Sequence, residues 1–454
     1  MRNYLPPNLN RKTSLALILI FAGIAVFEST IVKFSSYSGT EFPTWMHLSI
    51  FIFFSGIFIS FVIILGYMTR KNLPVESAAR NTPRGVRYFH RFAIIITILT
   101  VAIIVAIIAQ MIFYTHYSIS LLRIQTYITH ISPIVFLSYL IFLLSRWTIS
   151  SKKNLTTLFY AASFSVMTVN LVVSLIYLET YFSTSPLPYV KPYPIYRVVT
   201  LLGGLPLTES LSAAFDVLSL SSFLLTWIAT AILLSQYQRR MGRIKYFLLM
   251  SVPLVYYIYP FQNYFGDVLL PFLLSSPVMI SVIYALIFSA SKQVGAVFFS
   301  LAFWTASSLV HDDRVRKSLL LSSIGMAILF GSVELTPIQY LVYPPYGTVS
   351  AAFIPIGAYL LFVGIFTSAR YVSGDAKLRK EFYKTASSQL SLLKNIGVSQ
   401  MEKELEAKIK AVQESSAMTE IDEVPDLDDA DVKEILQDVL NELHSKKTDK
   451  EKSA

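Results

Sequence analysis

The sequence predicts an all-α, polytopic bundle of transmembrane helices followed by a short helical tail. Of its 454 residues, 54% are hydrophobic and only 15% are charged, and a soluble fold cannot bury that much apolar surface. The run 92–114 (FAIIITILTVAIIVAIIAQMIFY) carries no charged residue and is long enough to cross a hydrocarbon core of about 30 Å as a helix. Because its apolar residues are continuous rather than alternating, the pattern favours helices over a β-barrel.

Ten segments of this kind are expected to cross the bilayer, each bounded by a polar, charged or proline-containing connection. In chain order they are 13–34, 45–68, 92–114, 123–145, 155–178, 209–235, 246–262, 267–290, 318–336 and 347–367. Together they define a transmembrane domain at 1–367. The remaining residues, 368–454, are rich in charge and contain no such segment.

Lysine and arginine concentrate in alternate connections, and short loops rich in these residues stay in the cytoplasm. The basic groups precede the first span and follow the second, fourth and sixth; they are Arg2, Arg11 and Lys12; Arg70, Lys71, Arg80, Arg84, Arg87 and Arg91; Arg146, Lys152 and Lys153; and Arg239, Arg240, Arg243 and Lys245. The chain is therefore expected in the cell membrane with its N-terminus inside. The net charge of +10 reflects this bias and does not predict nucleic-acid binding.

A further apolar stretch, 294–310, is predicted to be re-entrant or interfacial. If it crossed the membrane, Arg314, Arg316, Lys317 and the whole tail would lie outside, against the charge rule. With ten spans, both termini are cytoplasmic. The alternative is that 246–290, which contains four prolines, crosses only once.

The sixth predicted span carries polar residues at intervals of three and four, which is typical of one helical face. They are Glu209, Ser212, Asp216, Ser219, Ser222, Thr226 and Thr230. Small hydroxylated residues suit a seam between packed helices. A seam needs no acid, however, so the carboxylate of Asp216 favours a water-lined or solute-lined path. Both interpretations are open on the sequence.

Ionisable residues within the spans gather in the half of the membrane that the charge rule places outside. An outward-facing polar vestibule is expected there, since such groups are costly in lipid unless they line a cavity or form pairs. Its candidate residues are Glu28, His47, His130, Asp216 and Glu334. Carboxylates and imidazoles could bind a cation or relay protons. No two of the histidines have the spacing of ligands on one helix, so no metal site and no cofactor is predicted.

Sequence motifs of catalysis are missing. The chain has no GxxxxGK[ST], no HExxH and no glycine-rich dinucleotide fingerprint, and it has no cysteine. Phe215-Asp216 and Gly266-Asp267 faintly resemble the paired aspartates of presenilin-like intramembrane proteases. Tyr264 stands where that family has glycine, and no Pro-Ala-Leu follows. No catalytic residue is therefore assigned, and an intramembrane or lipid-modifying enzyme is the least favoured class.

The tail is predicted to hold two amphipathic helices separated by an acidic linker at 414–427. Their apolar faces comprise Met401, Leu405 and Ile409 in the first helix and Val432, Ile435, Leu436, Val439, Leu440 and Leu443 in the second. Helices this short are unstable alone. They are expected to pack on each other, on the membrane domain, on a second copy of the chain as in a coiled coil, or on a cytoplasmic protein.

Four segments of the C-terminal third carry a family resemblance: SKQVGAVFFSLAFW (291–304), YPPYG (343–347), SGDAKLRK (373–380) and NIGVSQMEKELEAKI (395–409). They are similar to segments of a group of uncharacterised archaeal polytopic membrane proteins. The resemblance implies an archaeal-type plasma membrane and a cytoplasmic tail. It carries no functional residue over to this chain.

The favoured function is a membrane sensor or scaffold that couples the outward-facing vestibule to the cytoplasmic tail. A tail with partner-seeking faces, placed directly after the last span, supports this expectation. The alternative is a transporter or channel for a small solute, a cation or a proton, with the polar face of the sixth span as its path. The lipid bilayer is the expected surrounding in either case.

Overall fold

The computed structural model describes residues 9–37, 43–72, 84–150, 155–184, 189–190, 206–235, 242–258, 278–308, 310, 312–333 and 343–374. The chain divides into a large unit, Met1–Gln400, and a small one, Met401–Ala454. All described residues belong to the large unit. The predicted acidic linker and tail faces lie outside the described residues.

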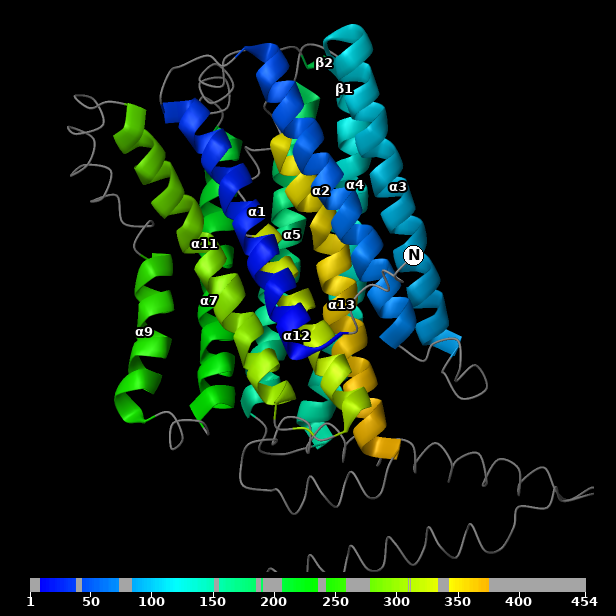
Figure 1. The fold of residues 1–454 in the computed structure, drawn as a ribbon, viewed down its shortest axis with the longest axis vertical. Coiled ribbons are helices and arrows are strands. Elements are labelled where there is room, and N and C mark those ends of the chain that lie inside the picture. The colour runs from blue at the N-terminus through cyan, green and yellow to red at the C-terminus, as the bar shows by residue number, and fades with distance from the viewer. Residues whose placement is uncertain are drawn as a thin grey trace, which may run out of the picture. The chain divides into compact units, whose positions relative to one another are not determined.

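The described residues form ten α-helices and one short β-ladder (Figure 1). The helices are α1 (Arg11–Tyr37), α2 (Thr44–Asn72), α3 (Arg84–Tyr114), α4 (Ile119–Ser150), α5 (Leu155–Thr184), α7 (Pro206–Ser235), α9 (Arg243–Ile258), α11 (Val278–Ser307), α12 (Asp313–Val333) and α13 (Tyr346–Gly374). Strands β1 (Tyr117–Ser118) and β2 (Tyr189–Val190) pair antiparallel. The all-α prediction is confirmed. Eight of these helices, all except α9 and α11, are long and apolar enough to cross a membrane.

The helices lie side by side, and successive helices run in opposite directions (Figure 1). The β-ladder marks one end of the bundle, which we call the ladder end; α1 ends there and α13 begins there. At the other end, called the opposite end, α1 begins and α13 finishes. Sites on different helices can therefore be compared by their distance from these two ends.

Helices α12 and α13 form the interior of the bundle. They pack against each other, α12 also contacts α11 and α1, and α13 contacts α4 and α3. Every residue of α13 up to Phe366 is buried. A Cβ atom on Gly357 would lie 2.7 Å from the backbone nitrogen of Leu329, so the two backbones approach as closely as they do because no side chain separates them.

Capping fixes where two of the helices begin. Asn10 Oδ1 accepts a hydrogen bond from the Thr13 amide at 2.8 Å, and α1 starts at the next residue, Arg11. Asp312 Oδ1 accepts from the amides of Arg314 and Val315, both at 2.9 Å, at the start of α12. All three hydrogen bonds satisfy amides that a first helical turn leaves without partners.

The prediction for 294–310 is wrong: most of this stretch is the second half of α11, a continuous helix of 30 residues. The prediction divided the chain at the polar sequence 291–293. In the structure Ser291 and Gln293 are buried, and Gln293 Nε2 donates to the Gly331 carbonyl of α12 at 2.9 Å. A neighbouring helix thus satisfies the polar interruption, and the helix needs no break there.

Parts of the seventh and eighth predicted spans, 259–262 and 267–277, lie outside the described residues, and the described helices there are α9 and α11. One helix boundary differs from the prediction. The last helix continues past 367 to Gly374, and Val372 and Ser373 are buried, so residues 368–374 belong to the bundle rather than to the tail.

Gly357→Ala tests the close packing of α12 and α13. The added methyl group would overlap Leu329 and should lower stability by about 1 to 3 kcal/mol. Gly56→Ala is the matched control, because a Cβ there meets nothing within 4 Å and alanine is the better helix former. Thermal denaturation in detergent should show a lower midpoint for the first variant and an equal or higher one for the second. Equal midpoints for both variants would contradict the close approach.

Candidate functional site: a polar cluster at the start of α13

Glu28 is a buried acid within α1, only 1% exposed. Its Oε2 accepts a hydrogen bond from the hydroxyl of Ser350, which lies near the start of α13 and is also buried. Its Oε1 has no hydrogen-bond partner among the described residues. Ion pairs within that part of the chain involve Glu179 and Asp313, and none involves Glu28.

A second contact links the start of α13 to α2. Tyr346 donates its hydroxyl proton to the His47 carbonyl at 3.1 Å, and His47 Nδ1 lies 3.0 Å from the same hydroxyl. Because the phenol has only one proton to give, the second contact requires the His47 Nδ1–H to be the donor. Tyr346 and Ser350 are four residues apart and so share one face of α13. We call Glu28, His47, Tyr346 and Ser350 the Glu28 cluster.

Aromatic rings close the space between the Glu28 cluster and the opposite end. The ring of Phe353, one turn after Ser350, packs edge to face against three others. Its centroid lies 5.3 Å from that of Phe21, 4.7 Å from that of Phe58 and 5.6 Å from that of Phe61. The cluster is therefore a group of polar side chains on α1, α2 and α13, buried except for the half-buried His47, with an apolar floor.

The chemistry of the Glu28 cluster follows from burial. A carboxylate in apolar surroundings is stable when it is protonated or when a cation neutralises it. The oxygen of Glu28 without a partner can carry a proton or contact a cation. Thr348, in the turn between Tyr346 and Ser350, adds a buried hydroxyl without a partner among the described residues. These are oxygen ligands, the kind that small hard cations prefer.

Two of the predicted vestibule residues, Glu28 and His47, thus meet the same helix. His130 lies elsewhere, between α4 and α5: its Nδ1 is 2.9 Å from the Thr126 carbonyl and its Nε2 is 3.1 Å from Ser174 Oγ. Asp216 is exposed on α7. Glu334 lies outside the described residues.

Three of the seven polar residues of the sixth predicted span face α5. Thr226 hydrogen-bonds Ser163 of α5 through the two hydroxyls, and Ser163 Oγ donates to the Ser222 carbonyl at 3.1 Å. Thr230 lies 3.4 Å from the Tyr160 hydroxyl. Ser219 bonds Tyr257 of α9 at 2.9 Å. These contacts favour the packing-seam interpretation over a solute path.

The remaining members of that face lie away from this seam. Ser212 is half-buried, and the side chain of Glu209 lies outside the described ones. Asp216 precedes Ser222 by six residues, which places it about 120° around the helix from Ser222. The residues spaced at three and four therefore do not all lie on the buried face of α7. Asp216, the acid that favoured a solute path, lies outside the seam.

Near the ladder end, Arg123 of α4 pairs with Glu179 of α5. The Nε–Oε2 distance is 3.3 Å, and both side chains are about one-third exposed, at 37% and 35%. The Tyr127 hydroxyl donates to Glu179 at 2.9 Å. An ion pair that is partly exposed contributes little to stability, and Glu179, which Arg123 neutralises, serves as a contrast to Glu28.

Sequence reasoning missed Tyr346, which directly precedes the tenth predicted span, and Ser350, which lies within it. The available signal was the spacing of hydroxyl groups at 346, 348 and 350, at the very start of the last helix. Among the described residues, no group of three or more histidines, aspartates or glutamates could hold a metal ion. In comparisons with protein-family models, curated proteins and solved structures, none matches this chain.

A double-mutant cycle tests the seam between α5 and α7. Ser163→Ala and Thr226→Val should each destabilise the protein, with a coupling free energy of about 0.6 kcal/mol, typical of hydrogen bonds between membrane helices. Ser221→Ala is the control, because its hydroxyl donates to the Val217 carbonyl of its own helix at 2.7 Å. Unfolding equilibria in detergent measure both cycles. A coupling free energy of zero between Ser163 and Thr226 would contradict the packing-seam interpretation.

Proposed function

We propose that this chain is a membrane sensor in which a proton or small cation at the Glu28 cluster controls a cytoplasmic tail through α13. The proposal rests on one observation. Ser350, which hydrogen-bonds Glu28, and Tyr346, which contacts His47, both belong to α13. That helix crosses the interior of the bundle and ends at Gly374, where the tail follows. A change in charge at Glu28 therefore acts directly on the helix that leads to the tail.

The proposal places the ladder end outside the cell membrane and the opposite end in the cytoplasm, with ten spans. The alternating directions of the ten helices support it (Figure 1). So does the distribution of arginine, since Arg70, Arg87, Arg91, Arg146 and Arg243 all lie on helix termini at the opposite end. The Glu28 cluster then faces outward.

The packing of α13 suits transmission over its whole length. Close to its middle, Gly357 contacts the α12 backbone closely, and towards its end Thr367 Oγ1 donates to Ser318 Oγ of α12 at 3.0 Å. Packed interfaces switch between discrete arrangements rather than deforming continuously. When Glu28 becomes neutral, its hydrogen bond to Ser350 weakens, because bonds to a charged carboxylate are the stronger ones. The start of α13 is then released from α1.

A transporter of protons or cations is the second candidate, because Glu28 Oε1 and Thr348 Oγ1 are buried oxygens without partners among the described residues. The aromatic floor at Phe353 supports the sensor instead, since a conduit would have to pass it. Flux into proteoliposomes separates the two: a proton or sodium flux that Glu28→Gln abolishes would replace the sensor with the transporter.

Glu28→Gln tests the sensor directly. The native chain has no cysteine, so spin labels at Ser308→Cys and Ser415→Cys report the distance between the opposite end and the tail without background labelling. In the parent protein, acidification or sodium should change this distance distribution. Glu28→Gln keeps the shape of the side chain but fixes it as neutral, so the distribution should no longer respond.

Glu179→Gln is the matched control, because it removes a half-buried acid that Arg123 neutralises near the same end of the bundle. It should respond to acidification or sodium as the parent protein does. A Glu28→Gln protein that still responds fully would contradict the proposal, as would a parent protein whose distance never changes.

A further inference from the structure

A cavity of about 230 Å³ lies between α2, α3 and α13, and Phe136 of α4 completes its wall. Four of its lining residues, Gly66, Arg70, Ile94 and Ile98, are exposed, so the cavity opens on the perimeter of the bundle. Bilayer lipid surrounds that perimeter in a membrane protein. The cavity is therefore accessible sideways, from the lipid.

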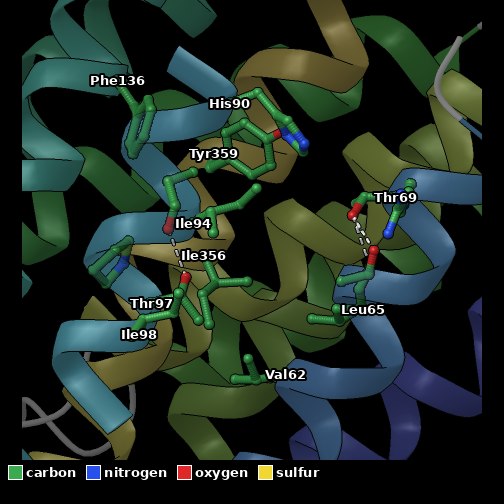
Figure 2. Close-up of a pocket in the computed structure, with 14 residues that line it drawn as sticks. Val62, Leu65, Thr69, His90, Ile94, Thr97, Ile98, Phe136, Ile356 and Tyr359 are labelled. Carbon is green, nitrogen blue, oxygen red and sulfur yellow. Dashed lines mark hydrogen bonds between the residues drawn. The ribbon is translucent and has the colours of Figure 1, made fainter. Parts of the chain in front are cut away.

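The two ends of the cavity differ in chemistry. Figure 2 shows His90, Tyr359 and Thr69 towards one end and Val62 and Ile98 towards the other. His90 Nδ1 lies 2.5 Å from the Tyr359 hydroxyl. Arg70, one residue after Thr69, also lines the cavity, so its polar end lies towards the C-terminus of α2 and the N-terminus of α3.

The remaining wall offers little to a polar ligand. The Thr69 hydroxyl donates to the carbonyls of Leu65 and Gly66, both at 2.9 Å, and the Thr97 hydroxyl donates to the Ala93 carbonyl at 2.8 Å (Figure 2). Both hydroxyls are thus occupied by their own helices. The ligand that fits has a hydrocarbon chain and one polar head.

The charge of the residues around the cavity favours an anionic headgroup. Helices α2 and α3 contain no aspartate or glutamate, whereas Arg70, Arg87 and Arg91 cluster where α2 ends and α3 begins. Cationic groups at a membrane surface attract anionic lipid headgroups, and arginine matches phosphate geometry especially well.

We infer that this cavity binds an anionic phospholipid of the surrounding bilayer, with one chain between Val62, Ile98 and Ile356 and its phosphate at Arg70 and His90. The site is independent of the Glu28 cluster. Ile356 and Tyr359 belong to α13, so a bound lipid contacts the same helix as the Glu28 cluster does. The aromatic layer at Phe353 lies between the two sites.

Photo-crosslinking in vesicles tests the site. The full chain is reconstituted in phosphatidylcholine that contains a phosphatidylglycerol probe with a diazirine in its acyl chain, and labelled peptides are identified by mass spectrometry. Labelling should map to α2, α3 and α13. Gly66→Leu should reduce it to background by filling the cavity. Gly56→Leu should not, since a Cβ at either glycine meets nothing within 4 Å but only Gly66 lines the cavity.

Arg70→Gln tests the headgroup contact. It should lower labelling by the anionic probe about fivefold, the effect of one cationic contact at a membrane surface, and leave labelling by a phosphatidylcholine probe unchanged. Arg243→Gln, an exposed arginine at the same end outside the cavity, should change neither. Equal labelling of the Gly66→Leu and Gly56→Leu proteins would overturn the site. Equal labelling of the parent protein by both probes would overturn the anionic selectivity.

Discussion

The close contact between the α12 and α13 backbones is the constraint on which the rest of the bundle depends. In a membrane, helices gain little from burying apolar side chains against one another, so association relies on packing and small residues. Gly325, Gly357 and Gly364 lie where a Cβ would meet the partner backbone. With α12 on one side and α1, α3 and α4 on others, α13 is enclosed, and its polar groups must find partners on neighbouring helices.

Three levels of polar contact along α13 follow from this enclosure. Near its start, Ser350 and Tyr346 meet Glu28 and His47. Further along, Tyr359 meets His90, and towards its end Thr367 meets Ser318. The Phe353 rings separate the first level from the second. One helix therefore contacts an isolated acid near the ladder end and, past the aromatic layer, a cationic cavity. This arrangement suits a transmitting element better than a continuous polar path.

The sequence was sufficient for what depends on local pattern. Continuous apolar runs predicted the helices, and the hydroxyl spacing of 219, 222, 226 and 230 predicted a buried face on α7. It could not show which helices are neighbours. The polar residue Gln293 therefore suggested a break in the helix, although the Gly331 carbonyl of α12 accepts its hydrogen bond. Asp216 was likewise grouped with Ser222, although six residues of helix place the two about 120° apart. Glu28 and His47 were predicted as candidates, but their common partner helix lies some 300 residues further along the chain.

Hydrogen–deuterium exchange along α13 tests the central claim most directly, because it reports both ends of the helix in one experiment. Amide exchange in Tyr346–Gly374 would be compared between the parent protein and Glu28→Gln in lipid nanodiscs. The coupling predicts altered exchange in the turns at 346–354 and also at the distant residues 368–374, which make no contact with Glu28. A change confined to the first turns would show that Glu28 only anchors the start of α13 and does not communicate with the tail.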